Sequence, residues 1–298
     1  MNLKELSFPL RIYWDLKPEP DKPTLNITQI CKGIAEVKAL SLSLLDAGAQ
    51  LSDSCIEILE KVKDQDISVD LTVSHSSLNP SITEFLSRLK VNELLIDAST
   101  DDDLRSLVEI VRWNKDGNMS LGVSFNADGG NYRSIPAVVS FCRGNDITRL
   151  AFPMQRLTEK GDCFYIGREE GRALALKLSE LNIDNMKLTI HDPFLWRVFY
   201  PGIAFPGCGC QAANTMAHIS SDGDVYPCPS MPFVLGDPRK ETLKTILSSA
   251  HKKSLRKGLI VPPEECLGCG ELDQCMGGCR GRTFALSGSF DRRDPACF

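Results

Sequence analysis

Cysteines near the C-terminal end of this chain have the residue type and the spacing of metal ligands. Of the twelve cysteines in the sequence, eight lie between Cys208 and Cys297, and four of these fall in CLGCGELDQCMGGC, residues 266–279. Thiolates bind zinc, copper(I) and the iron of iron–sulfur clusters. Eight is two sets of four, the ligand number of a tetrahedral zinc or a cubane iron–sulfur cluster. In a reducing compartment this concentration predicts metal binding rather than disulfides.

The run that begins at Cys266 has the local features that such a site needs. Cys266 and Cys269 form a CxxC pair, which lets two sulfurs reach one centre from a tight turn, and Cys275 and Cys279 follow after five and three intervening residues. Glycines in the run allow positive φ and a close approach of the backbone; they are Gly268, Gly270, Gly277 and Gly278. Taken alone, this run is compatible with zinc as well as with an iron–sulfur cluster.

The full cysteine pattern extends this run in both directions. Upstream, Cys210, Gly223 and Cys228 form C-x12-G-x4-C, the run itself is C-x2-C-x5-C-x3-C, and Cys297 follows downstream. Over residues 208–298 the pattern resembles the SPASM domain, a C-terminal extension of many radical S-adenosylmethionine enzymes that act on peptides. The resemblance implies two 4Fe–4S clusters, with zinc as the alternative metal.

The resemblance also implies which cysteines hold each cluster. The cluster I set is Cys208, Cys210, Cys228 and Cys279, and the cluster II set is Cys266, Cys269, Cys275 and Cys297. In this arrangement Cys279, the last cysteine of the run, is the fourth ligand of the upstream cluster, so the two metal sites together cross-link one small domain. Only one residue separates Cys208 from Cys210, a narrower gap than the family usually has, which leaves open whether both are ligands.

A second motif that this resemblance calls for is absent from the sequence. Radical S-adenosylmethionine enzymes hold a cluster with one open iron on C-x3-C-x2-C, but after the first expected strand only Cys31 is present. The family's Gly-Gly-Glu stretch corresponds to DAGAQL, residues 46–51, which has no glutamate. The combination resembles pseudo-radical-SAM SPASM proteins, above all the SPASM-domain component of GeoRSP-type systems. No site for S-adenosylmethionine is therefore expected.

The elements that position these cysteines follow a βα pattern. Strands are expected at 11–16, 39–45, 67–74, 93–97, 119–125, 147–152 and 187–192, with helices between them. Ser54 with Glu57, and Asn79 before Pro80, are the clearest helix start signals. Alternating strands and helices predict an α/β fold with a parallel sheet. We expect a partial (β/α)6-type, radical-SAM-like barrel over residues 1–202 and a small cysteine-rich SPASM domain over 203–298.

One face of several expected strands is polar. A fully packed parallel barrel is apolar on both strand faces, so polar inward positions predict a lumen that opens onto solvent or a ligand. The alternative is the solvated edge of an open sheet. The possible lumen pocket consists of Arg11, Tyr13, Asp15, Asp70, His75 and Ser124.

Other single residues have plainer interpretations. His75 and His191 lie at expected strand ends, and each is more often structural than catalytic there. Arg280 and Arg282 flank Cys279 and either offset the charge of a cluster or are surface charges. The basic HKKSLRKG stretch, residues 251–258, is typical of a solvated helix face. The remaining cysteines are interpreted as ordinary buried residues: Cys31, Cys55, Cys142 and Cys163.

Composition sets the broad class of the protein. The chain has 298 residues, 42% of them hydrophobic and 24% charged, with a net charge of -5 and a pI of about 5.5. A mildly acidic chain gives no general electrostatic reason to bind nucleic acid or an anionic membrane. No apolar run reaches the ~20 residues of a membrane helix, and the N-terminus lacks a signal-peptide core. A cytoplasmic location is expected.

Three functions are compatible with these features. The first is an accessory iron–sulfur subunit of a radical peptide-modifying system, relaying electrons or positioning peptide; the resemblance implies as partners an intact radical SAM/SPASM enzyme, a peptide-chaperone-like subunit and a peptide substrate. The second is a binding scaffold whose iron–sulfur or zinc sites are structural. The third is an enzyme that works at an auxiliary cluster or in the lumen.

Overall fold

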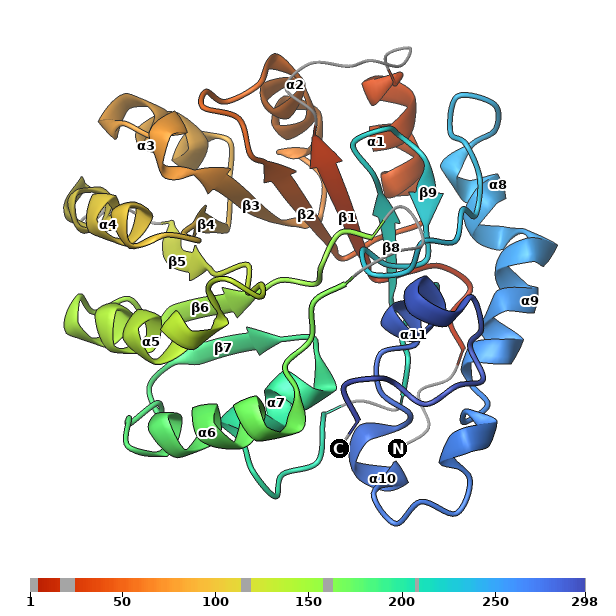
Figure 1. Cartoon of the computed structure of the whole chain (residues 1–298). Helices are drawn as coiled ribbons and strands as arrows, with labels where there is room; N and C mark the ends of the chain where they lie inside the picture. The colour runs from red at the N-terminus through yellow and green to blue at the C-terminus, as the bar shows by residue number, and fades with distance from the viewer. Residues whose placement is uncertain (1–4, 17–24, 114–118, 158–162, 207–208, 298) are drawn as a thin grey trace.

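A single curled sheet organises the chain. The computed structural model describes residues 5–16, 25–113, 119–157, 163–206 and 209–297. Within them nine strands pair in the order β7-β6-β5-β4-β3-β2-β1-β8-β9. The first seven are parallel and neighbours in sequence order, which makes a partial barrel (Figure 1). These strands are β1 (Arg11–Leu16), β2 (Ser41–Asp46), β3 (Ser68–Ser74), β4 (Glu93–Asp97), β5 (Ser120–Ser124), β6 (Arg149–Phe152) and β7 (Lys187–Ile190).

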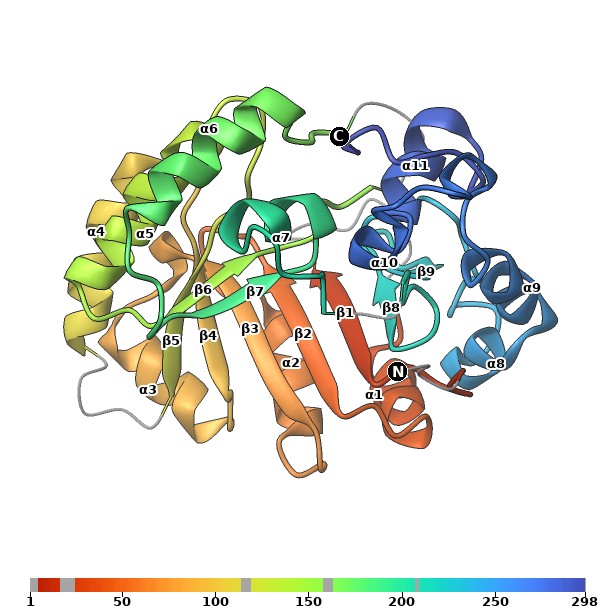
Figure 2. The same cartoon turned by 90° about the horizontal axis from the view of Figure 1, so that it is seen from below.

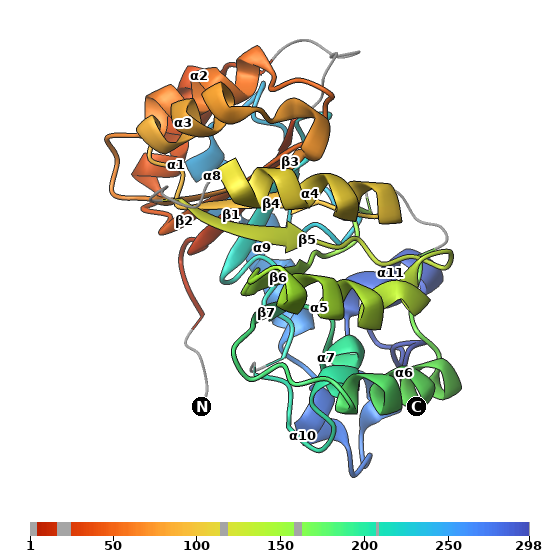
Figure 3. The same cartoon turned by 90° about the vertical axis from the view of Figure 1, so that its left-hand side faces the viewer.

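Helices cover the outer side of this sheet. Figures 1 and 3 show α1 to α6 following one another around the arc of strands. Each crossover returns the chain to start the next parallel strand. The helices are α1 (Ile27–Glu36), α2 (Asp53–Val62), α3 (Pro80–Arg88), α4 (Asp101–Trp113), α5 (Ile135–Gly144), α6 (Arg168–Ser179) and α7 (Pro193–Phe199). The fold expected from the sequence is confirmed.

Side-chain caps set the helix starts. The Asn79 side chain accepts the backbone N–H of Ile82 over 3.0 Å at the start of α3, as its position before a proline predicts. At α2 the expected capping box is displaced. Ser52, not Ser54, has the extended backbone of a cap, and its hydroxyl accepts the N–H of Cys55 over 3.1 Å. Ser54 already lies inside the helix.

The strands bury one face more completely than the other. In β2, Leu42 and Leu44 are 0% and 1% exposed, whereas the alternating residues Ser41 and Ser43 are only half-buried. The apolar side chains pack under the helices in the main core. Polar side chains consequently line the inner side of the curl, which is the arrangement that the alternating sequence predicts.

The C-terminal segment, residues 209–297, continues the same sheet. Strand β8 (Met216–Ile219) pairs parallel to β1, and β9 (Val225–Tyr226) pairs antiparallel to β8. Figure 2 shows this segment, in cyan and blue, beside the β1 side of the arc. The remaining helices are α8 (Leu243–Ser248), α9 (Ala250–Leu259), α10 (Leu272–Cys275) and α11 (Arg280–Ser287). A division of the chain at residue 202 stays a prediction.

Close packing joins the C-terminal segment to the barrel. A Cβ built on Gly33 in α1 would lie 2.9 Å from Cβ of Leu243 in α8, so only glycine allows the two helices to approach this closely. Among the described residues, no helix combines the length and the apolar character needed to span a bilayer.

Candidate metal centre

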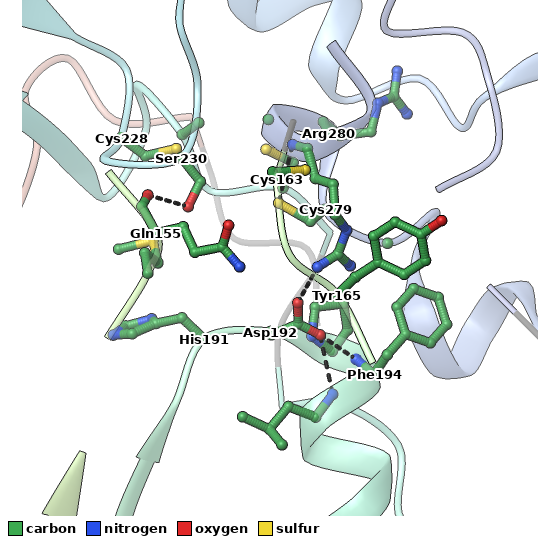
Figure 4. A pocket seen from close by; sticks show the side chains of 18 of the residues that line it. Gln155, Cys163, Tyr165, His191, Asp192, Phe194, Cys228, Ser230, Cys279 and Arg280 are labelled. Atoms are coloured by element: carbon green, nitrogen blue, oxygen red, sulfur yellow. Dashed lines mark hydrogen bonds and ion pairs between the residues drawn. The ribbon is translucent and has the colours of Figure 1, made fainter. Parts of the chain in front are cut away.

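Three cysteines of the cluster I set face one cavity. Cys210 precedes β8, Cys228 follows β9 and Cys279 caps α11, and all three line a cavity of about 240 Å³. Figure 4 shows Cys228 and Cys279 in this cavity. Burial raises the pKa of the Cys228 thiol well above its ordinary value, and the neighbouring Cys210 and Cys279 thiols raise it further. Burial also raises the pKa of Cys279 to about 12. The fourth member, Cys208, lies outside the described residues.

The four cysteines of the cluster II set also lie near one another. Burial raises the pKa of Cys266, and the neighbouring thiols of Cys275, Cys297 and Cys269 raise it further. The pKa of Cys297 is also raised, mainly by burial and next by the neighbouring Cys275 thiol. Cys266 and Cys275 are buried, whereas Cys269 is exposed. This set therefore reaches the protein surface.

The donor chemistry of both sets fits a sulfur-ligated metal centre. Thiol-only donor sets suit zinc or iron–sulfur clusters and do not suit magnesium or calcium. Thiols with raised pKa values carry their protons when free, and a bound metal displaces those protons. In the part of the chain that the structure describes, no group of three or more His, Cys, Asp or Glu side chains is arranged to hold a single metal ion. The fit therefore rests on the donors and on the charges around them.

Asp294 fixes the backbone at Cys279. Its Oδ2 accepts the N–H of Cys279 over 2.6 Å, and the Cys279 Sγ in turn accepts the N–H of Arg282 over 3.4 Å. Gly278 has a φ of +74°, and a Cβ there would lie 2.5 Å from the same Asp294 oxygen. The Arg282 guanidinium donates to both oxygens of Asp294 over 2.8 Å and also pairs with Asp192 at the start of α7. The thiol of Cys279 is thus held by a buried charged network.

Arg280, the next residue, is buried at 1% exposure. Its Nη1 donates to the backbone oxygen of Val261 over 3.0 Å and its Nη2 to that of Gly258 over 3.5 Å. Its Nε is buried and has no hydrogen-bond partner. Burial lowers the pKa of Arg280, while the nearby Cys210 and Cys266 thiols act in the opposite direction. Of the two interpretations left open by the sequence, the surface charge is therefore wrong for Arg280.

Arg256 supports Cys210 from α9. Its Nη1 donates to the backbone oxygens of Cys210 and Ala212 over 2.7 and 2.9 Å, and its guanidinium pairs with Glu5. Arg256 is only 5% exposed, so the interpretation of residues 251–258 as a wholly solvated face is wrong at this position. Its spacing to Lys252, Leu255 and Leu259, which are also buried, is helical and is the sequence signal that marks the inner face of α9.

Comparison with known families decides what this cysteine-rich segment is. The model of the SPASM family, described as an iron–sulfur cluster-binding domain, matches residues 208–270. The chain contains a SPASM domain. The matched residues include Cys210, Cys228, Cys266 and Cys269 and the strands β8 and β9.

Two curated relatives match part of the chain. The AdoMet-dependent heme synthase of Methanosarcina barkeri is 33% identical over 92 residues, which is 30% of this chain and 25% of that protein. The PqqA peptide cyclase of Granulibacter bethesdensis is 34% identical over 89 residues, 28% of this chain and 24% of that protein. The match spans about a quarter of the length of these relatives.

Solved structures resemble the chain over nearly its whole length. Streptococcus suis SuiB has a TM-score of 0.69 at 18% identity, covering 99% of this chain and 78% of that one. SuiB bound to the precursor peptide SuiA has a TM-score of 0.70 at 19% identity, covering 98% and 76%. The enzyme anSMEcpe with AdoMet and the Cp18Cys peptide has a TM-score of 0.66 at 16% identity, covering 95% and 93%. At these identities the likeness establishes the fold.

The inner side of the barrel holds a buried charged group at the end of β1. Asp15 is 8% exposed and accepts from Nε2 of His218 over 2.9 Å and from Nε of Arg156 over 3.2 Å. Burial raises the pKa of Asp15, but the hydrogen bond from His218 and the charge of Arg156 outweigh it, and the pKa is lowered. His218 comes from β8 in the SPASM domain, so this contact ties the domain to the barrel.

A second cavity, of about 730 Å³, lies at the opposite ends of the strands. Arg11, Tyr13 and Asp70 line it, as expected for a polar lumen. Arg11 Nη2 lies 3.8 Å from Asp70 Oδ2, and the Arg149 guanidinium pairs with Glu93 beside them. The positive and negative side chains therefore largely pair with one another along this cavity.

The structure does not bring all six predicted lumen residues together. Asp15 lies with Arg156 and His218 and lines neither cavity, and Ser124 is buried at 3% exposure and lines neither. His75 also lines neither and sits in a 3₁₀ turn after β3, with its Nδ1 3.1 Å from Oδ1 of Asp103 in α4. For His75 the reason is that β3 ends at Ser74, so its side chain no longer follows the alternation of the strand and contacts α4 instead.

Two residues that the sequence analysis interprets as structural, Cys163 and His191, also line the site. Cys163 lines the same cavity as Cys228 and Cys279, and Figure 4 shows it on the Cys279 side of that cavity. His191 lines both cavities, and its Nε2 is 3.3 Å from the Tyr13 hydroxyl. Burial lowers the pKa of His191 to about 4. Cys163 lies on the β6–α6 loop, and no sequence signal marks its approach to the SPASM domain.

Proposed function

We propose that this chain is an accessory iron–sulfur protein of a radical S-adenosylmethionine peptide-modification system. The observation that carries the proposal is the pairing of two thiol sets in a SPASM domain with a half-barrel whose sequence has no C-x3-C-x2-C motif. A SPASM domain provides thiol ligands for iron–sulfur clusters. Without the three-cysteine motif, the half-barrel has no ligands for a cluster with an open iron.

In this proposal both cysteine sets hold a 4Fe–4S cluster. Bound clusters supply one-electron transfer at potentials set by net charge, hydrogen bonds to sulfur and exposure. Residues of the chain position the thiols through hydrogen bonds. Arg256 donates to the backbone oxygen of Cys210, and Asp294 accepts the backbone N–H of Cys279. The fourth position of cluster I goes to Cys208; Cys163, which lines the same cavity, is the competing thiol.

The peptide is proposed to lie against the cavity beside cluster I. Aromatic side chains of Phe164, Tyr165 and Phe194 line this cavity, and Tyr165 is 38% exposed. Mostly apolar walls with a few polar groups are typical of ligand sites. Two similar proteins are named for peptides, the PqqA peptide cyclase and SuiB with its precursor peptide SuiA. This supports a peptide as the substrate of the system.

The proposed partner is an intact radical SAM/SPASM enzyme, together with a peptide-chaperone-like subunit, in the cytoplasm. Cluster II reaches the surface at Cys269, which is exposed. Exposure of one ligand brings a cluster within reach of a docked redox partner. Electrons would therefore pass between the partner and cluster I through cluster II, while the barrel and its cavity position peptide.

Anaerobic purification followed by iron, sulfide and zinc analysis with EPR tests this function. We expect about eight irons and about eight sulfides per chain after reconstitution, from two four-iron clusters. Reduction should give EPR signals of two clusters, and adding the loaded chain should raise the partner's turnover. Two zincs per chain without sulfide would instead establish the scaffold with structural metals. Peptide modification by the isolated chain would establish an independent enzyme.

A further inference from the structure

Arg280 occupies an unusual position for a charged side chain. It begins α11 directly after the cluster I cysteine Cys279, and it is among the largest side chains with less than 2% exposure. Arginine keeps its positive charge in proteins, even where burial lowers its pKa. A positive charge is therefore sealed inside the SPASM domain.

Among the described residues, no carboxylate accepts a hydrogen bond from Arg280. The two hydrogen bonds from Arg280 go to the neutral backbone oxygens of Val261 and Gly258. Its ion pair with Asp291 is long, 4.0 Å, and that carboxylate is 73% exposed. The Nε–H has no acceptor at all. A buried charge with such partners is costly unless another anion lies nearby.

The positive charge of Arg282, two residues away, is compensated by carboxylates of the protein. Its side chain is 5% exposed, but it pairs with the carboxylates of Asp192 and Asp294. The same short helix thus carries two buried guanidinium groups, one neutralised by carboxylates and one not. The difference indicates that the anion for Arg280 comes from outside the protein's own carboxylates.

Arg280 lines the same cavity as Cys210, Cys228 and Cys279 of the cluster I set. Besides the exposed Asp291, the groups that interact with its charge are thiols, Cys210 of the cluster I set and Cys266 of the cluster II set. These thiols become thiolates when they bind metal. A four-iron cluster with four thiolates is an anion, so each set would present negative charge to the same guanidinium.

We propose that Arg280 is the counter-charge shared by the two clusters and raises the reduction potentials of both. This inference rests on the proposed function, because it needs both clusters to be present. A reduced cluster carries one more negative charge than an oxidised one, so a fixed cation stabilises the reduced form more. The effect is large in a poorly solvated interior, where charges are weakly screened.

The test is a pair of reduction potentials, measured by EPR-monitored redox titration of the full chain after anaerobic reconstitution. In Arg280→Met, we expect the reduction equilibrium of both clusters to fall at least tenfold, which is about 59 mV for a one-electron couple. Arg292→Gln is the matched control, since it removes the same charge from an exposed position of the same domain. It should leave both potentials unchanged.

Two further measurements keep the outcomes distinct. Iron and sulfide content is measured first. A wild-type chain that binds no clusters would contradict the proposed function itself. If the chains bind both clusters, the two potentials test the role of Arg280. If Arg280→Met does not load, Arg280→Gln decides, because it also removes the charge but keeps an amide that can donate to the backbone oxygens; both potentials should fall as in Arg280→Met. A fully loaded Arg280 variant with neither potential shifted, or with only one shifted, overturns the inference.

Discussion

The backbone N–H of Cys279 donates to Oδ2 of Asp294 over 2.6 Å, and this bond ties a proposed cluster ligand to a carboxylate fifteen residues further along the chain. The same carboxylate accepts from Arg282 and from the N–H of Ala296, and it is 2% exposed. One buried side chain therefore orders both the backbone at Cys279 and the turn that leads to Cys297.

Replacing Asp294 by Asn should destabilise the SPASM domain strongly. Removing one partner of a buried ion pair costs about 3–5 kcal/mol when the other charge is left without a partner; here Arg282 keeps its ion pair with Asp192, so we expect a loss below that range. We expect a lower midpoint of thermal unfolding and less iron bound at both clusters. Asp291→Asn is the control, because the Asp291 side chain is 73% exposed. Equal unfolding midpoints and iron contents for the two variants would contradict this role.

Cys279→Ser should lower the iron content by about half or more, because four thiolates hold one cluster. Cys163→Ser is the matched control, since it removes a thiol from the same cavity that is not in the proposed ligand set. Iron and sulfide analysis of the reconstituted variants measures both. If Cys163→Ser lost as much iron as Cys279→Ser, Cys163 would be a ligand, and a parallel Cys208→Ser variant would show which of the two completes cluster I.

The sequence predicted the sheet because its signals are local. Period-two alternation marked strands such as residues 67–74, and caps such as Asn79 marked helix starts within a turn. The two cysteine sets could be assigned through resemblance to a family whose pattern is one of spacing, and the structure places the described members of each set near one another. That these sets bind iron stays a prediction.

Contacts between distant parts of the chain could not be predicted in this way. Asp15 meets His218 across 203 residues, and no local pattern links them. Arg280 and a surface arginine look alike in sequence, because burial depends on how the C-terminal turns fold around the side chain. The position of His75 next to an expected strand predicts a lumen residue, but β3 ends at Ser74 and the His75 side chain contacts Asp103 in α4.

His191 should make stability fall as pH drops from 6.5 to about 4. Burial, aided by the charges of Arg11 and Arg156, lowers its pKa from 6.5 to about 4 in the folded chain. In that window the unfolded chain binds a proton that the folded chain does not, so the free energy of unfolding decreases, by about 3 kcal/mol. Above pH 6.5 neither state is protonated and the effect vanishes.

Denaturant unfolding across this pH range measures the effect. His191→Gln should flatten the dependence between pH 6.5 and 4, whereas His251→Gln, on the exposed side of α9, should not. An NMR titration of the His191 ring in the folded protein gives the pKa directly. A midpoint near 6.5 would show that the ring is solvated and that the interpretation of a buried neutral imidazole is wrong.

The isolated chain should not cleave S-adenosylmethionine, even with both clusters loaded. Reductive cleavage needs an iron with an open coordination site beside the bound cofactor, and in the proposed ligand sets each cluster has four protein thiolates. The only cysteine after β1 and before β2 is Cys31, which is 2% exposed within α1, and burial raises its pKa to about 12. At the end of β2, Asp46 is buried and its Oδ2 accepts the N–H of Ser52. This carboxylate therefore stabilises the loop between β2 and α2.

The measurement is 5′-deoxyadenosine formed under dithionite, with the intact radical SAM/SPASM partner as the positive control and the metal-free chain as the background. We expect the loaded chain alone to match the background. Adding it to the partner should increase peptide modification, and a cluster II variant such as Cys269→Ser should reduce that increase, because Cys269 is the exposed ligand where electrons would enter. Formation of 5′-deoxyadenosine by the chain alone, above the metal-free background, would mean that one of its clusters has an open iron and that the chain is an enzyme in its own right.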